Sequence, residues 1–233
     1  MSQWNELIDI FGCAWNKDEV PECLADNICI AWPSMMSGIE KAFDGKRSLK
    51  ALDFGCGGGL FCRKLSEMNF IVTGYDPSAE LVEKAKSNVP EGAYITDSIL
   101  DAEKRGKYDL IASSMVFPFI EDMESVVVDL LEMLKDDGFL IFAVFNPEFI
   151  EDNLSDSIFS GFIERRSGFM ELEKGVTIPT YSRTSTEYQN LFEQHGYKEV
   201  YFDLPIPTQD FLSKYSMPFS TNKPEFIIQG FRR

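Results

Sequence analysis

Histidine is nearly absent from this sequence, and basic residues are scarce. The chain has one histidine, and 22 basic side chains stand against 38 acidic ones, which gives a net charge of −16 at neutral pH. Proteins that bind nucleic acids or anionic membranes need a positive surface that displaces counterions. The charge therefore argues against DNA, RNA and membranes as partners.

Cysteines are few and irregularly spaced. They are Cys13, Cys23, Cys29, Cys56 and Cys62. An odd number without a CxxC pair signals neither a disulfide framework nor a zinc site, and we expect no bound metal. Reduced, mostly buried thiols are the simplest interpretation, and they suit a reducing cytoplasm.

Long apolar runs and linkers are also missing. The longest apolar run, Phe139–Phe145, falls far short of the roughly 20 residues that span a bilayer. The first residues, Met-Ser-Gln-Trp-Asn-Glu, lack the basic start and apolar stretch of a signal peptide, so we expect a cytoplasmic protein. No Gly/Ser/Pro-rich segment divides the 233 residues, which suit one compact domain.

Short apolar stretches alternate with helical ones from about residue 50 onward. The expected strands are Lys50–Phe54, Phe70–Gly74, Ala93–Thr96, Tyr108–Ser113 and Phe139–Phe145. The expected helices are Leu60–Met68, Ala79–Ser87 and Met123–Lys135, the last ending at Asp136-Asp137-Gly138. This order predicts a doubly wound, Rossmann-like α/β sheet with helices on both faces and a ligand crevice at the carboxyl ends of its strands.

The C-terminal part departs from this alternation. Thr184–His195 has the pattern of a helix closed by Gly196, and Lys198–Leu204 that of a sixth strand. A loop of about twenty residues without a clear helix then precedes a seventh strand, Glu225–Phe231. A connection without a helix is typical of a hairpin between antiparallel strands rather than of a crossover between parallel ones. We therefore expect a sheet of seven strands whose last strand is antiparallel.

Three segments lie outside the sheet pattern. We expect residues 1–46 to form an N-terminal helical cap or lid on a main domain of residues 47–233. Residues 147–183 and 205–223 are expected as insertions in that domain. Within the first insertion, Arg165-Arg166-Ser167-Gly168-Phe169 resembles a hairpin turn.

The sharpest motif follows the first strand, where an acid precedes a glycine-rich turn and a helix. The residues are Asp53-Phe54-Gly55-Cys56-Gly57-Gly58-Gly59. Glycines let the backbone turn tightly and let a ligand touch the main chain, and the helix N-terminus offers N–H groups to an anion. A dinucleotide fingerprint would need glycine at position 60, which is Leu60, whereas the pattern Asp-x-Gly-x-Gly-x-Gly fits.

Acids also end the second and third strands. Asp76, in Tyr75-Asp76-Pro77, can accept hydrogen bonds from two adjacent ribose hydroxyls. Asp97, in Thr96-Asp97-Ser98, can accept from an exocyclic amine, which only donates. Each acid alone could be a helix cap or a surface turn, but acids at three successive strand ends form a pattern that these explanations do not cover.

The glycine turn and the two acids resemble the motifs of class I S-adenosylmethionine-dependent methyltransferases. The resemblance implies S-adenosylmethionine as cofactor and a small molecule as methyl acceptor. It implies that the cofactor meets Asp53, Gly55, Cys56, Gly57, Asp76, Asp97, Ser98 and Ser113, the last at the end of the fourth strand. Leu134-Lys135-Asp136-Asp137-Gly138 before the fifth strand is also similar to the family.

Two features of that family are missing. Many O-methyltransferases of this group carry a histidine after the fourth strand, where this chain has Met115-Val116-Phe117-Pro118-Phe119. Its one histidine, His195, lies at a helix end before Gly196, where it is explained by that placement. A DPPY-type tetrad is absent after the fourth strand, which argues against DNA amino methylation. Either another residue serves as base, or the acceptor needs none.

We expect Trp32, Tyr181 and Arg183 at the acceptor pocket, because they lie in segments that flank the strand ends. The twenty phenylalanines suggest an apolar or aromatic acceptor. Two other functions remain open: an NAD(P)-dependent oxidoreductase on a similar sheet, and a non-catalytic protein that binds an adenosine ligand. Neither the acceptor nor the oligomeric state follows from the sequence.

Overall fold

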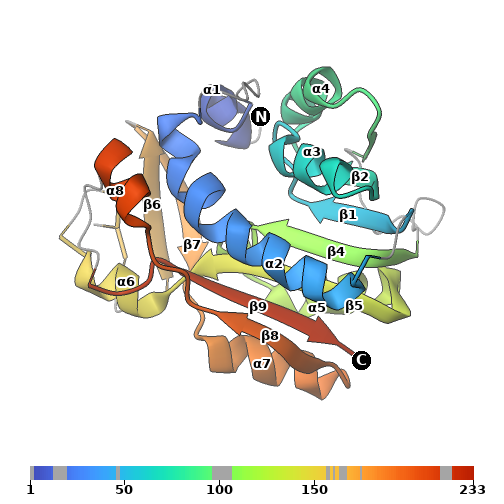
Figure 1. Ribbon diagram of the computed structural model, residues 1–233. Coiled ribbons are helices and arrows are strands. Elements are labelled where there is room, and N and C mark those ends of the chain that lie inside the picture. Colours follow the sequence, from blue (N-terminus) through green and yellow to red (C-terminus); the bar gives the residue numbers. More distant parts are fainter. Residues whose placement is uncertain are drawn as a thin grey trace.

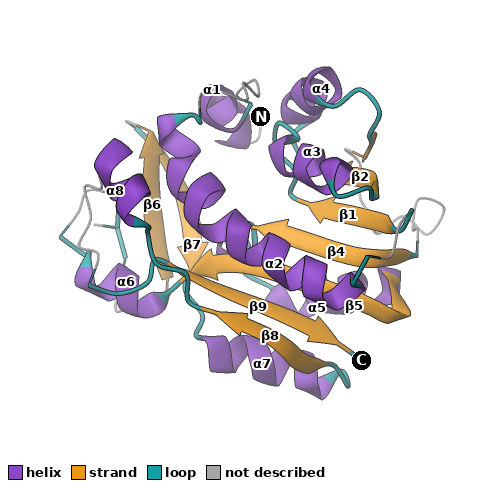
Figure 2. Cartoon of the chain, in the orientation of Figure 1, coloured by secondary structure: helices purple, strands orange, loops and turns teal. Residues whose placement is uncertain are grey.

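The protein folds around a twisted seven-stranded sheet in the order β3-β2-β1-β4-β5-β9-β8 (Figures 1 and 2). The computed structural model describes residues 3–12, 20–45, 48–95, 107–155, 158–159, 161–162, 167–173, 175–215 and 222–233. In spatial order the strands are β3 (Ala93–Ile95), β2 (Ile71–Tyr75), β1 (Lys50–Phe54), β4 (Tyr108–Ser114), β5 (Leu134–Phe145), β9 (Phe226–Arg232) and β8 (Lys198–Asp203). The expected fold class, an α/β Rossmann-like sheet of seven strands, is confirmed.

The strand directions place the carboxyl ends of the central strands at one edge. β1 pairs parallel with β2 and with β4, β2 with β3, and β4 with β5. β9 inserts antiparallel between β5 and β8, as expected for the last strand. The direction of the winding switches between β1 and β4, which is where α/β sheets bind ligands.

Helices cover both faces of the sheet, and each face has its own apolar core. One core lies under α2 (Trp32–Phe43), α3 (Leu60–Glu67) and α4 (Ala79–Asn88). The other lies under α5 (Met123–Met133) and α7 (Ser185–Gln194). Burial of apolar side chains on both faces explains why the central strands have nearly continuous apolar sequences.

The N-terminal 46 residues have two structural roles. The helix α2 lies against the sheet, where Met35 and Ile39 are fully buried (Figure 1). Three short helical turns and a single-turn helix precede it: η1 (Gln3–Leu7), α1 (Ile8–Phe11), η2 (Glu22–Leu24) and η3 (Asn27–Ala31). η1 and α1 lie near the amino end of α3, at the carboxyl edge of the sheet. The position of a cap is therefore taken by η1 and α1, and α2 is part of the core.

The segment after β5 forms a separate lobe with its own small apolar cluster. It contains α6 (Pro147–Asp152) and a hairpin of β6 (Ser167–Glu173) and β7 (Val176–Tyr181). The predicted turn at Arg165–Phe169 is wrong for its described part, since Ser167, Gly168 and Phe169 lie in β6. A Cβ on Gly168 would lie 2.4 Å from the carbonyl oxygen of Gly161, so this glycine serves close chain packing.

Two other expectations on local structure are corrected. The helix predicted to reach Lys135 ends at Met133, because Leu134 already pairs with Tyr108 in the sheet. The loop expected to lack a helix contains α8 (Gln209–Lys214). Thr208 caps that helix by accepting from the backbone N–H of Phe211, whose side chain is buried. With six residues, α8 is too short for helical periodicity to be visible in the sequence.

Candidate functional site

A cavity of about 390 Å³ opens at the carboxyl ends of β1, β2 and β4. Its walls come from the β1–α3 loop, the end of β2, the segment between β4 and α5, and the N-terminal residues Trp4, Phe11, Leu24, Asn27 and Trp32. This volume lies within the range of roughly 300–1,000 Å³ that is usual for small-molecule sites. Asp53, Gly55, Cys56, Gly57, Asp76 and Trp32, all predicted from the sequence, line it together.

The glycine loop between β1 and α3 turns through backbone conformations that favour glycine. The φ angles of Gly55, Gly57 and Gly59 are 79°, 49° and 82°. A Cβ on Gly55 would lie 2.2 Å from Val116, so a side chain there would displace the opposite cavity wall. The loop is therefore shaped by its glycines for close approach.

The carboxylate of Asp76 lies at the end of β2 and is 7% exposed. One oxygen accepts from the backbone N–H of Gly57 and the other from that of Ser78, each at 2.9 Å. Burial raises the pKa of Asp76, and the two backbone hydrogen bonds oppose that rise. The side chain thus links β2 to the glycine loop and presents a buried carboxyl group to the cavity.

Asp53 and Cys62 lie beneath the loop. Asp53 is 1% exposed, and the thiol of Cys62 donates to its carboxylate at 3.1 Å. Burial raises the pKa of Asp53 to about 7. Cys29, Cys56 and Cys62 are free thiols, and Cys56 and Cys62 are buried as expected, whereas Cys13 lies outside the described residues.

Three side chains form a hydrogen-bonded chain at the end of β4. The indole N–H of Trp32 donates to the hydroxyl of Ser114 at 3.0 Å, and Ser114 donates to the side-chain oxygen of Asn27 at 2.9 Å. All three line the cavity. Sequence reasoning selected Trp32 but missed Asn27 and Ser114, because no local motif marks them and they meet only through the fold.

Aromatic side chains form much of the remaining wall. Trp4 packs edge-on against Phe119 with ring centroids 4.9 Å apart, and Trp32 lies 5.0 Å from Phe61. Phe11 also lines the cavity, from the end of α1. These residues come from separate segments of the chain, and together they make this part of the cavity wall apolar and aromatic.

Other predicted site residues lie beside the cavity or outside the described chain. Ser113 is 1% exposed and donates to the carbonyl of Phe54, so its side chain holds β4 to β1. Neither Tyr181 nor Arg183 is among the lining residues. Asp97 and Ser98 lie outside the described residues.

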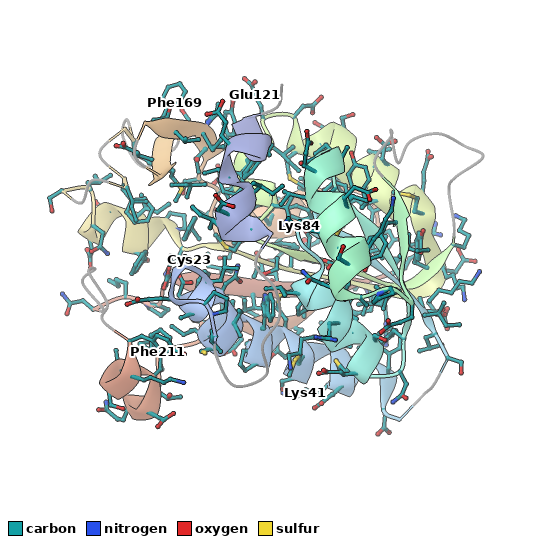
Figure 3. The ribbon with its side chains drawn as sticks, turned by 90° about the horizontal axis from the view of Figure 1, so that it is seen from above. Cys23, Lys41, Lys84, Glu121, Phe169 and Phe211 are labelled. Carbon is teal, nitrogen blue, oxygen red and sulfur yellow. The ribbon has the colours of Figure 1, made fainter. Side chains whose placement is uncertain are left out.

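Arg183 supports one wall of the cavity from behind. Its guanidinium donates to the carbonyl oxygens of Ile120 at 2.8 Å and Glu121 at 2.7 Å, and more weakly to that of Phe117. Phe117 begins the short helical turn η4 (Phe117–Phe119), and Phe119 and Ile120 line the cavity. From above, the hairpin that carries Phe169 lies next to this turn and Glu121 (Figure 3).

The described residues contain no cluster of three or more His, Cys, Asp or Glu side chains that could hold a metal ion. In the same part of the chain, no helix is both long and apolar enough to cross a bilayer.

Comparison with known proteins gives the first independent indication of a family. The sequence model of a family described as a methyltransferase domain matches residues 32–201. The matched segment contains the glycine loop, Asp76 and the whole of β4. It covers well over half of the chain.

Curated relatives match over shorter stretches. A ubiquinone biosynthesis O-methyltransferase from Vibrio campbellii is 32% identical over 114 residues, which are 46% of this chain and 48% of that protein. A malonyl acyl-carrier-protein O-methyltransferase from Bacillus anthracis is 25% identical over 123 residues, which are 51% of this chain and 46% of that protein. The chain spans about half the length of the curated relatives it matches.

Solved structures share the fold over most of the chain. The magnesium protoporphyrin IX methyltransferase of Synechocystis PCC 6803, solved with bound SAH, superposes with a TM-score of 0.66 and 17% identity, covering 99% of this chain and 94% of that one. An S-adenosylmethionine-dependent methyltransferase from Mesorhizobium loti has a TM-score of 0.65 and 19% identity, covering 86% of this chain and 98% of that one. At these identities the likeness concerns the fold.

Proposed function

The chain belongs to the class I S-adenosylmethionine-dependent methyltransferase family, and from this premise we propose that it transfers a methyl group from S-adenosylmethionine to an oxygen atom of a small, largely apolar molecule. The observation that carries the proposal is that the glycine loop, Asp53 and Asp76 line one cavity of about 390 Å³.

The residues present fit this donor. Each oxygen of Asp76 already accepts one backbone N–H, and each has a second lone pair left for a ribose hydroxyl. When bound, S-adenosylmethionine supplies a methyl group activated by a positive sulfonium. The carboxylate of Asp76 favours a cationic ligand at this position, and the described lining holds no Arg or Lys that could pair with the pyrophosphate of a dinucleotide.

The acceptor side of the cavity favours an apolar or aromatic molecule. Trp4, Phe11, Trp32 and Phe119 present large ring surfaces there. The two curated relatives above are O-methyltransferases by name, which supports oxygen as the acceptor atom. An aryl or enol hydroxyl combines an apolar body with a single nucleophilic oxygen.

The kinds of base in the cavity limit the acceptor further. Among the described residues that line the cavity, none is His, Lys or Arg. As the oxygen–methyl bond forms, the hydroxyl proton passes to water or to a lining carboxylate, and the electron pair of the broken sulfur–methyl bond returns to sulfur. Hydroxyls that ionise readily, such as phenols and enols, are the acceptors that suit such a site.

Binding and turnover test the proposal directly. A ligand at 100 times its dissociation constant should stabilise the fold by about 2.7 kcal/mol, so S-adenosylmethionine and S-adenosylhomocysteine should raise the melting temperature and NAD should not. Methyl-labelled donor should then transfer label to phenols in a panel that also contains carboxylic acids and amines. Stabilisation by NAD alone would point to the oxidoreductase alternative. Binding without transfer to the panel or to a metabolite extract would favour a non-catalytic binder.

A further inference from the structure

The hydrogen-bonded chain at the end of β4 has a defined direction. An indole N–H can only donate, so the Ser114 hydroxyl accepts from Trp32. The hydroxyl proton of Ser114 is then directed to Asn27, whose side-chain oxygen lies 2.9 Å away. The Asn27 amide is thereby held with its oxygen toward Ser114 and its NH₂ group on the other side.

Asn27 presents this amide to the cavity. It lines the cavity at the first residue of η3, and the neighbouring Asp26 accepts from its backbone N–H at 2.7 Å. Within the described lining, Asn27 is the one residue with a side-chain amide. Its NH₂ group supplies two N–H donors in an orientation that is fixed before a ligand arrives.

The backbone donors of the glycine loop are already occupied. The N–H groups of Gly55 and Cys56 donate to Tyr75, that of Gly58 to Phe11, and that of Gly59 to Cys56. The N–H of Gly57 donates to Asp76. A ligand carboxylate in this cavity therefore needs donors from outside residues 55–59.

The donor carries a carboxylate that requires such partners. A partly buried carboxylate without hydrogen bonds is costly, and the described lining offers it no Arg, Lys or His. We propose that the side-chain amide of Asn27, oriented by Ser114 and Trp32, receives the carboxylate of the methionine portion of the donor. This assignment rests on the proposed function, because it presupposes that S-adenosylmethionine binds here. Asn27 is a binding residue in this scheme, and Ser114 is a positioning residue.

Two probes separate this role from a general effect on the site. S-adenosylhomocysteine has the carboxylate, whereas 5′-methylthioadenosine keeps the adenosine and sulfur but lacks the amino-acid part. Asn27→Asp replaces the NH₂ group by a charged oxygen of nearly the same shape, and it should weaken S-adenosylhomocysteine binding by roughly a hundredfold or more. The affinity for 5′-methylthioadenosine should stay within about twofold, because no contact of that probe has changed.

Ser114→Ala provides the second variant. It leaves Asn27 in place but removes the group that orients it, so the loss for S-adenosylhomocysteine should be smaller, roughly threefold to tenfold, and again absent for 5′-methylthioadenosine. Asn69→Asp is the matched control, because Asn69 is exposed in the turn after α3 and its substitution adds the same charge. That variant should bind both probes as the wild type does. Melting curves without ligand show that each variant is folded.

The possible outcomes separate the role of Asn27 from the proposed function of the protein. Equal losses for both probes, or no loss for either, in a folded Asn27→Asp protein would overturn the assignment of Asn27 alone. Unselective loss in Ser114→Ala would overturn its orienting role. A wild-type protein that binds neither probe would overturn the proposed function, and with it this inference.

Discussion

At the scale of single residues, Asp76 has a structural role and is also the proposed anchor of the donor. Its two oxygens hold the backbone of Gly57 and Ser78 while the carboxyl group lines the cavity. Its burial is tolerated because both oxygens are hydrogen-bonded. The same geometry makes it the expected anchor of the ribose.

Replacing Asp76 should weaken donor binding in two steps. Asp76→Asn keeps the shape but loses the charge and one acceptor, and Asp76→Ala loses both acceptors. Hydrogen bonds to a charged group are worth about 1.5–3 kcal/mol, so Asp76→Ala should weaken S-adenosylhomocysteine binding by roughly tenfold to hundredfold, and Asp76→Asn by less. Titration calorimetry measures both. Asp44→Asn, in an exposed turn, is the control, and unchanged affinity in a folded Asp76→Ala protein would place the ribose anchor elsewhere.

At the scale of elements, residues 3–12 act as a strap over the cavity. The backbone oxygen of Phe11 accepts from the N–H of Gly58 at 2.9 Å, so the strap is bound to the glycine loop itself. The rings of Trp4 and Phe11 line the cavity from this strap. We propose that the strap is the part of the N-terminal region that serves as a lid, since α2 belongs to the core.

A single methyl group should displace the strap. In Gly58→Ala the new Cβ would lie 2.6 Å from the oxygen of Phe11 and 3.0 Å from the Cα of Gly12. Gly58, unlike its neighbours, does not have a positive φ, so the loop itself should tolerate alanine. We expect faster hydrogen exchange and proteolysis within residues 3–12, weaker binding of S-adenosylhomocysteine and an unchanged sheet.

The control for this variant is Gly175→Ala, in the β6–β7 turn. Its Cβ would meet nothing within 4 Å, although its φ of 85° makes alanine mildly unfavourable. It should lower stability slightly without exposing the strap. If Gly58→Ala left both the protection of residues 3–12 and the ligand affinity unchanged, the strap would be packing rather than a lid.

At the scale of the whole molecule, a pair of neighbouring carboxyl groups should make stability depend on pH. Glu225, immediately before β9, is 4% exposed, and its carboxyl group lies close to that of Asp26, which precedes η3. Burial and the neighbouring Asp26 raise the pKa of Glu225 well above its usual value, and burial also raises that of Asp26. We therefore expect this pair, which lies between the N-terminal segment and the last strand, to hold a proton in the folded state.

This pair should lower stability as the pH rises. A carboxyl group with a raised pKa in the folded state stabilises the fold fully below the ordinary pKa of about 4, and this contribution is lost as the pH passes the raised value. Each tenfold difference in proton affinity between folded and unfolded states is worth roughly 1.4 kcal/mol. Glu225→Gln keeps a donor toward Asp26 without a titrating proton, so its melting temperature should fall less between pH 5 and pH 8 than that of the wild type.

The exposed Glu80 provides the matched control for this change. Glu80→Gln alters the net charge equally and should leave the pH dependence as it is in the wild type. Some pH dependence should also persist in Glu225→Gln, because Asp53, with a pKa raised to about 7, titrates in the same direction. An unchanged slope in Glu225→Gln would show that the pair does not hold a proton in the folded state.

Local patterns were sufficient for much of the fold and for one side of the site. Strand β1, the glycine loop and Asp76 lie close together in the sequence, and their chemistry follows from consecutive residues such as Asp53 and Gly55. The antiparallel last strand followed from the length of the segment before it. The short helix α8 and the true turn of the β6–β7 hairpin were missed, because a single capped turn and a glycine required by packing have no periodic pattern.

The sequence by itself determined the class of the sheet, the strand end that carries the ligand loop and the acids beside it, because hydrophobic periodicity and glycine turns act over a few residues. Only the tertiary structure decided which side chains complete the cavity. Asn27, Trp32 and Ser114 are joined across 82 to 87 positions of the chain, and Arg183 supports its wall from 62 to 66 positions away. Such contacts depend on how α2, β4 and the hairpin pack against one another, and no local pattern encodes that packing.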